Sequence, residues 1–115
     1  MAHYIIQDAY TGYIWGDTRD IDGKVYQAVD VVAACRELDR SIGGAEGRVY
    51  SEVSRLSSDT GYLVYRVDIG GSDAVAVVHD GQNKETIKSV EDECDLVGYV
   101  EWQPAQGLVA VEVCE

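Results

Sequence analysis

Hydrophobic residues at the start of the chain fall into two short β-prone runs, residues 4–8 and 13–15. The segment between them contains Gly12, which can adopt the positive φ that a tight turn between two strands requires. The pattern therefore predicts a β-hairpin. A polar loop over residues 17–23 follows, and residues 24–29 fit either a third strand or the start of a helix.

The hydrophobic period changes after Asp30. Apolar side chains then recur every three or four residues, at Val31, Val32, Cys35, Leu38 and Ile42. This spacing predicts an amphipathic helix over about residues 31–42. We expect the Asp30 carboxylate to cap its first turn, and Gly43 and Gly44 to end it.

The middle of the chain is expected to be extended. Residues 48–54 and 62–69 have strand character and are separated by a turn at residues 57–61. Residues 74–78 are continuously apolar, which is typical of a strand that is buried on both faces.

A second, shorter and more charged helix is predicted over residues 84–94. Its apolar stripe is thin and consists of Ile87, Val90 and Cys94. Asn83 is its expected N-terminal cap. Residues 96–102 and 108–113 are then predicted to form a closing hairpin.

Runs of strands with two separated helices indicate an α+β fold. We expect a single domain over residues 1–115, with a largely antiparallel sheet of about five to seven short strands and two helices (about residues 31–42 and 84–94) on one face of it. A chain of this length buries roughly two-thirds of the surface that its unfolded form exposes, so it can fold without a metal or a disulfide.

Cysteine usage and hydropathy indicate a cytoplasmic protein. The three cysteines, Cys35, Cys94 and Cys114, are odd in number and form no C-x-x-C pair, which favours reduced thiols. The first residues lack the basic and apolar regions of a signal peptide, and no segment has the ~20 apolar residues of a transmembrane helix.

Charge narrows the range of partners. The net charge is −12, and residues 67–115 carry eleven acids against Lys84 and Lys88 alone. Nucleic-acid binding depends on Lys and Arg displacing counterions from phosphates, so direct binding to nucleic acid is not expected. An anionic membrane surface is disfavoured for the same reason.

The densest acidic segment is residues 91–95, where Glu91, Asp92, Glu93 and Asp95 surround one cysteine. On a helix, Glu91 and Asp95 would be four residues apart and could share one hard cation. Asp95 falls where the helix should end, however, and no calcium-loop spacing completes the set. Carboxylates near a helix C-terminus also oppose the macrodipole. A solvated acidic surface that binds a basic partner is the favoured interpretation.

Other candidate sites lack a complete pattern. Residues 20–23 match only the first positions of a calcium loop, and residues 43–47 are Gly-rich but follow a helix, so neither predicts an ion site. His79 and Asp80 could act with Cys35 or Cys94, but no spacing brings them together. No catalytic residue and no cofactor are therefore expected.

Aromatic residues are interleaved with acids in the first and last hairpins, at Tyr10, Tyr13, Trp15 and Asp17, and at Asp95, Tyr99, Glu101 and Trp102. Core packing is the favoured interpretation of each aromatic because the chain has no Phe. Tyr and Trp are also enriched in interface hot spots.

These features favour a non-enzymatic acidic protein that binds a basic protein in its nucleic-acid-binding groove. Its charge and size resemble those of small acidic inhibitors, including viral inhibitors of host restriction and CRISPR complexes. The expected contact residues are Glu91, Asp92, Glu93, Asp95, Tyr99, Glu101 and Trp102. Two alternatives stay open: a protein-interaction domain, which could dimerise through sheet edges, and a metal-dependent module that uses the acids of residues 91–95.

Overall fold

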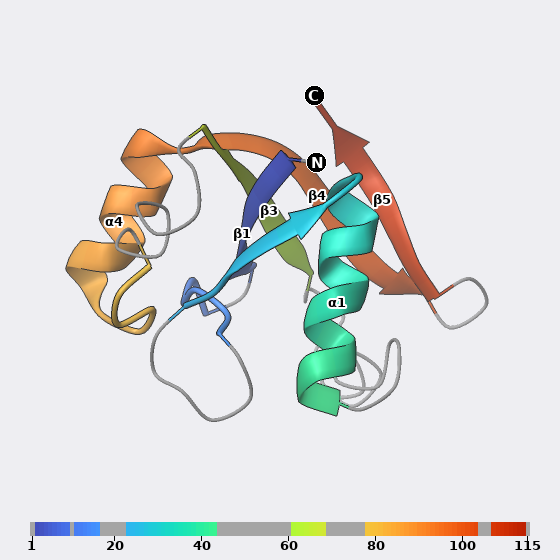
Figure 1. Ribbon diagram of the computed structural model, residues 1–115, viewed down its shortest axis with the longest axis horizontal. Coiled ribbons are helices and arrows are strands. Elements are labelled where there is room, and N and C mark those ends of the chain that lie inside the picture. The colour runs from blue at the N-terminus through green and yellow to red at the C-terminus, as the bar shows by residue number, and fades with distance from the viewer. Residues whose placement is uncertain are drawn as a thin grey trace.

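The computed structural model describes residues 2–9, 11–16, 23–43, 61–68, 78–103 and 107–114. Within these residues, five strands form one antiparallel sheet with the order β2-β1-β3-β4-β5 (Figure 1). The elements are β1 (Ala2–Asp8), β2 (Val25–Ala28), α1 (Val31–Gly43), β3 (Tyr62–Val67), α4 (Lys84–Glu93), β4 (Asp95–Gln103) and β5 (Gly107–Val113). The predicted α+β fold is confirmed. The predicted strands at residues 48–54 and 74–78 lie outside the described residues, apart from Val78, which is in a turn.

The first hairpin forms with a short second arm. Gly12 has a φ of +85°, and the Asp8 amide donates to the Tyr13 carbonyl at 2.9 Å. Among the described residues, the second arm pairs with β1 through a bridge between Gln7 and Ile14 and through the Trp15 amide, which donates to the Ile6 carbonyl at 2.9 Å. The next strand along the sheet is instead β2, which resolves the ambiguity of residues 24–29 in favour of a strand.

Both helices begin at the predicted caps. The Asp30 carboxylate accepts the Ala33 amide at 2.8 Å, and the Asn83 side chain accepts the Glu85 amide at 2.8 Å. Each cap satisfies an amide that has no partner within its own helix. The start of each helix is therefore fixed by local chemistry.

Helix α1 covers one face of the sheet. Its residues Val31, Ala34, Cys35 and Leu38 are buried against strand residues such as Ile6. The strand side of this layer includes three tyrosines with relative exposures of 2% or less: Tyr4, Tyr26 and Tyr62. The prediction that Tyr replaces Phe in the core is correct for these residues.

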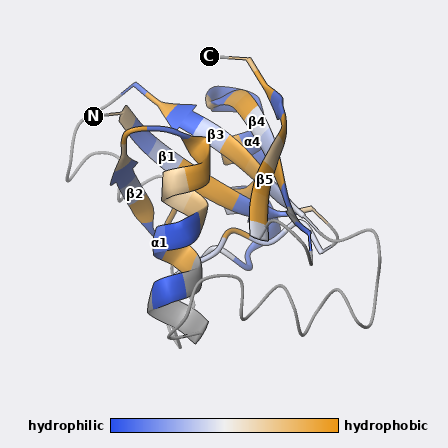
Figure 2. Cartoon of the chain, turned by 90° about the vertical axis from the view of Figure 1, so that its right-hand side faces the viewer, coloured by the Kyte–Doolittle hydropathy of each residue, from blue (hydrophilic) through white to orange (hydrophobic). Residues whose placement is uncertain are grey.

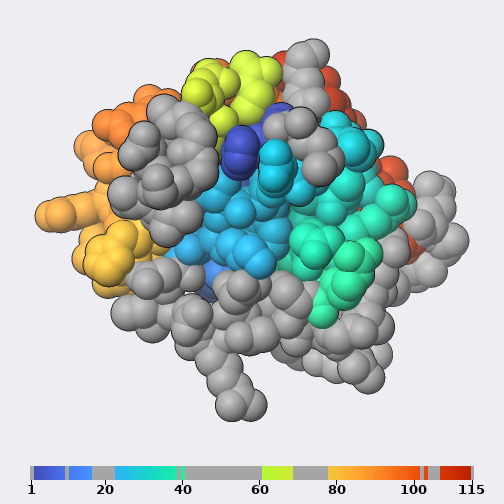
Figure 3. Space-filling model, viewed as in Figure 1, coloured from blue at the N-terminus to red at the C-terminus, as the bar shows by residue number. Residues whose placement is uncertain are grey.

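Helix α4 lies on the opposite face of the sheet. Its buried residue Val90 packs in a second cluster with Ile5, Tyr65 and Val67. Ile5 and Ile6 are adjacent on β1 and point to opposite faces, so the two clusters are separated by the sheet. The expectation that both helices share one face was therefore wrong. Figures 1 and 3 show α4 at one side of the molecule, apart from α1.

Neither described helix is long and apolar enough to cross a membrane.

Three backbone segments meet closely at Gly81. The Ile14 amide donates to the Gly81 carbonyl at 2.8 Å, and the Gly23 amide donates to the Val78 carbonyl at 2.7 Å. A Cβ atom at position 81 would lie 2.5 Å from the Ile14 carbonyl oxygen, which is backbone and cannot rotate away. Only glycine fits this position.

We expect Gly81→Ala to lower the free energy of unfolding by about 1–3 kcal/mol, because the added methyl group forces these segments apart. Urea denaturation of the variant beside Gln82→Ala, an exposed position in the same turn, measures the difference. Equal stability of the two variants would show that the segments do not meet as described.

Candidate functional site

The last turn of α4 carries an exposed acidic group and no basic residue. Val90 is buried, and Glu91, Asp92 and Glu93 follow it at the surface. The helix ends at the next residue, where the Cys94 amide donates to the Val90 carbonyl at 3.0 Å. The three carboxylates therefore lie at the negative end of the helix dipole, where their charge is unfavourable to the helix itself.

Two further aspartates, one just after β3 and one at the start of β4, lie near the end of α4, because both act with Glu93 to raise the pKa of the Cys94 thiol. Arg66 Nη2 lies 3.4 Å from Asp95 Oδ2, and Arg66 Nε lies 3.4 Å from Asp68 Oδ1. Strand pairing brings them together, because Arg66 is opposite Asp95 in the β3–β4 register. The side chains of Asp68 and Asp95 are 73% and 63% exposed, so water screens both ion pairs strongly.

We call this group the acidic surface, defined by Asp68, Glu91, Asp92, Glu93 and Asp95. Sequence reasoning missed Asp68, because its place depends on the pairing of β3 with β4. Asp95 is the first residue of β4, so it does not share a helical face with Glu91. Across the described ranges, no three His, Cys, Asp or Glu side chains converge as a metal site.

The acidic surface affects the ionisation of its neighbours. Burial raises the pKa of the Cys94 thiol, and the nearby carboxylates of Glu93, Asp95 and Asp68 raise it further. Burial also raises the pKa of Tyr65, with Glu91 adding to the effect. A raised thiol pKa is the opposite of the activation that a cysteine nucleophile needs. Cys35 packs in the α1 cluster and Cys94 against the α4 cluster, on opposite faces of the sheet.

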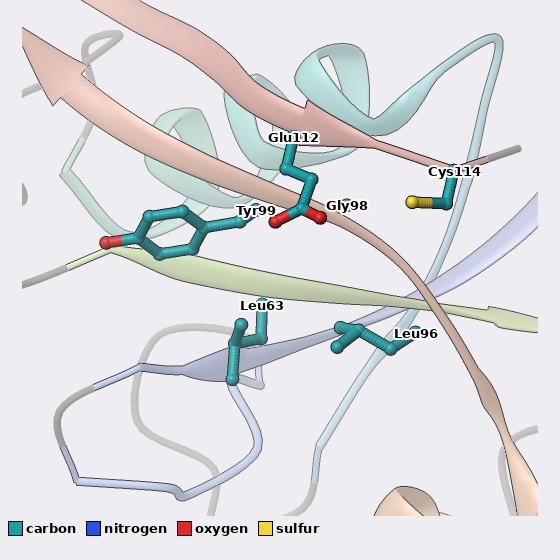
Figure 4. Close-up of a pocket in the computed structure, with 6 residues that line it drawn as sticks. All are labelled: Leu63, Leu96, Gly98, Tyr99, Glu112 and Cys114. Atoms are coloured by element: carbon teal, nitrogen blue, oxygen red, sulfur yellow. The ribbon is translucent and has the colours of Figure 1, made fainter.

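A hollow of about 330 Å³ lies on the sheet face that α4 covers only in part (Figure 4). Its lining consists of Leu63, Leu96, Gly98, Tyr99, Glu112 and Cys114. Leu63, Tyr99 and Glu112 are register partners on three neighbouring strands, so their side chains point to the same face. The lining is apolar apart from the Glu112 carboxylate and the Tyr99 hydroxyl.

Local sequence explains the shape of the hollow. Gly98 lines the floor with its backbone alone, because a Cβ at this position would point to the α1 face of the sheet, 3.2 Å from Val31. The Tyr99 ring lies over Gly61, where any side chain would overlap the ring. Leu96 is 52% exposed, which is high for a leucine and marks the open end of the hollow.

The predicted contact residues are thus divided between two adjacent features. Glu91, Asp92, Glu93 and Asp95 belong to the acidic surface, whereas Tyr99 lines the hollow. Glu101 is two residues further along β4 and shares the face of Tyr99. The backbone of Trp102 pairs with Leu108, but its side chain lies outside the described residues.

The aromatic residues of the first hairpin pack against the core. The Tyr13 and Trp15 ring centroids are 4.8 Å apart, and Trp15 makes an edge contact with Tyr62 at 6.2 Å. Trp15 is partly buried against the α1 cluster. Tyr10 and Asp17 lie outside the described residues.

Burial raises the pKa of Tyr13 to about 12, and the Asp8 carboxylate adds to the rise. The unfolded chain ionises this hydroxyl near pH 10, while the folded protein keeps its proton to about pH 12. We therefore expect Tyr13 to contribute its full stabilisation below pH 10 and to lose it as the pH rises toward 12. Denaturant titrations across this window should show a shallower pH dependence for Tyr13→Phe than for the unchanged protein. Superimposable profiles would contradict the shift.

Comparisons of the chain with protein-family models, with curated protein sequences and with solved structures found no match.

Proposed function

We propose that the protein is a non-enzymatic binding protein whose acidic surface attaches to a basic protein partner. The observation that carries the proposal is the group of five exposed carboxylates at the end of α4 and on the adjoining strands. They contribute little to the fold, because three oppose the helix dipole and two form only exposed ion pairs. A positively charged partner would neutralise these carboxylates and so gain a favourable interaction with them.

The partner chemistry follows from the charge of the whole chain. A net charge of −12 attracts basic surfaces over long distances and accelerates association at low salt. Basic grooves on proteins are the places where nucleic acids bind. The protein would occupy such a groove and compete with nucleic acid for it. An inhibitor of restriction or CRISPR machinery, as viruses use, is one form of such a competitor.

We further propose that the protein acts in the cytoplasm. All three cysteines are free thiols, and Cys114 is exposed. Free cysteines, including an exposed one, are typical of proteins in a reducing compartment.

An affinity capture from cell lysate tests the proposal. The bait proteins are the unchanged chain, a variant with Glu91→Gln, Asp92→Asn, Glu93→Gln and Asp95→Asn, and a control with Glu37→Gln and Asp39→Asn on α1. We expect a nucleic-acid-binding protein to be retained by the unchanged and control baits, to be released by moderate salt, and to be lost from the fourfold variant. Equal capture by all three baits would refute the role of the acidic surface.

A further inference from the structure

The hollow beside the acidic surface contains one carboxylate among apolar side chains. Figure 4 shows the Glu112 carboxylate between the Tyr99 ring and the Cys114 sulfur, with Leu63 and Leu96 across the hollow. The Glu112 side chain makes no hydrogen bond or ion pair with any described residue, although its backbone belongs to the β4–β5 pairing. A negative group with an aromatic ring on one side and two leucines below it is suited to a cation with an apolar stem.

We propose that the hollow binds an arginine side chain of the partner; this inference rests on the proposed function and names the residue that the partner inserts. The guanidinium would pair with the Glu112 carboxylate through two parallel N–H donors. Its flat face would stack on the Tyr99 ring, and its methylene stem would cover Leu63 and Leu96.

Three observations favour arginine over other occupants. The volume of about 330 Å³ is at the lower end of the range for ligand pockets, so it suits one long side chain rather than a cofactor. A wholly apolar side chain would leave Glu112 without a partner. Lysine carries a compact and strongly hydrated charge that neither pairs bidentately nor stacks as well as guanidinium.

A second copy of the chain is the main competing occupant. Figure 2 shows β5 as a largely hydrophobic strand, and Val111 and Val113 are 53% and 50% exposed. No described strand pairs with the outer edge of β5, so edge-to-edge dimerisation is geometrically open. Each copy carries a net charge of −12, however, and this repulsion opposes self-association. The same negative charge attracts a basic partner.

The test uses two peptides of equal charge, hexa-arginine and hexa-lysine, and measures their binding to the full chain by fluorescence anisotropy at low salt. We expect hexa-arginine to bind about fivefold more tightly, as stacking and bidentate pairing together suggest. Its addition should shift the backbone NMR signals of Gly98, Tyr99 and Glu112.

Variants separate the hollow from the acidic surface. Tyr99→Leu and Glu112→Gln should remove the preference for arginine while leaving hexa-lysine binding nearly unchanged, and Tyr99→Phe should retain it because the ring remains. Glu85→Gln is the control for the loss of one charge elsewhere on the exposed surface. The fourfold variant of the acidic surface should bind both peptides more weakly, by a similar factor.

The possible outcomes distinguish the arginine site from the proposed function. Equal binding of the two peptides, or a preference that survives Tyr99→Leu and Glu112→Gln, would overturn the arginine site and leave the proposed function in place. Failure of both peptides to bind the unchanged protein while it is monomeric by light scattering would overturn both the arginine site and the proposed function. Burial of the hollow in a dimer, seen as a doubled mass by light scattering and insensitivity to either peptide, would assign it to a second copy instead.

Discussion

Leu38→Ala is expected to lower the free energy of unfolding by about 2–5 kcal/mol, the range for removing a fully buried leucine. Leu38 has no solvent exposure and fills the layer between α1 and the sheet, where the side chain of Ile6 and three tyrosines also pack. Alanine would leave a cavity that these aromatic rings cannot easily fill. The effect should be the largest of any single truncation on the helix.

Glu37→Ala is the matched control, because Glu37 is the preceding residue and points to solvent. It forms a 2.7 Å ion pair with Arg40, but the two side chains are 53% and 62% exposed, so the pair contributes only a few tenths of a kcal/mol. Urea denaturation of both variants gives the difference directly. A loss of under about 1 kcal/mol for Leu38→Ala would mean that α1 does not pack on the sheet as described.

The second large effect concerns binding. The fourfold variant, with Glu91→Gln, Asp92→Asn, Glu93→Gln and Asp95→Asn, should bind the captured partner about 10- to 100-fold more weakly at low salt. Exposed charges at an interface act chiefly on the association rate, so most of the loss should appear there. The difference from the unchanged protein should shrink as salt screens the remaining charges.

Stability measurements test whether the weaker binding of the fourfold variant results from partial unfolding. Three of the four carboxylates lie at the helix C-terminus, where their removal relieves an unfavourable interaction with the dipole. We therefore expect the fourfold variant to unfold at the same or a slightly higher urea concentration. A weakened interaction that appears mainly in the dissociation rate, or that persists at high salt, would contradict an electrostatic role.

The sequence predicted the helices and the last two strands well, because each carries its own local signal. Asp30 and Asn83 are residue types that favour a helix start, and each is followed by an apolar stripe with helical spacing. The α1 and α4 boundaries therefore agree with the predicted ranges to within one residue.

The hydrophobic periods of the helices do not predict which face of the sheet each helix covers. An amphipathic pattern shows that a helix buries one stripe, but it does not show which face of a sheet receives the stripe. The signal in the sequence is the continuous apolar run Tyr4-Ile5-Ile6, and the structure buries all of residues 4–8 between the two covered faces of the sheet. A run of three apolar residues is too short to distinguish a strand covered on both faces from one arm of a hairpin covered on one face.

The candidate site was predicted only where it is contiguous in sequence. Residues 91–95 stand out as an acidic run, whereas Asp68 joins them through the β3–β4 register. Leu63 meets Tyr99 in the same way, across the β3–β4 pairing, whereas Glu112 faces Tyr99 across the predicted hairpin of β4 and β5. Strand order decides which of these residues meet. Hairpin signals in the sequence do not determine the order of β1, β3 and β4.

A competition assay tests the central claim most directly. The captured partner is loaded with its labelled nucleic acid, and the protein or the fourfold variant is added at increasing concentration. We predict that the unchanged protein displaces the nucleic acid at low salt and that the fourfold variant requires at least tenfold more protein to do so. A stable complex that contains partner, nucleic acid and this protein together would contradict the account, because the acidic surface would then bind somewhere other than the groove.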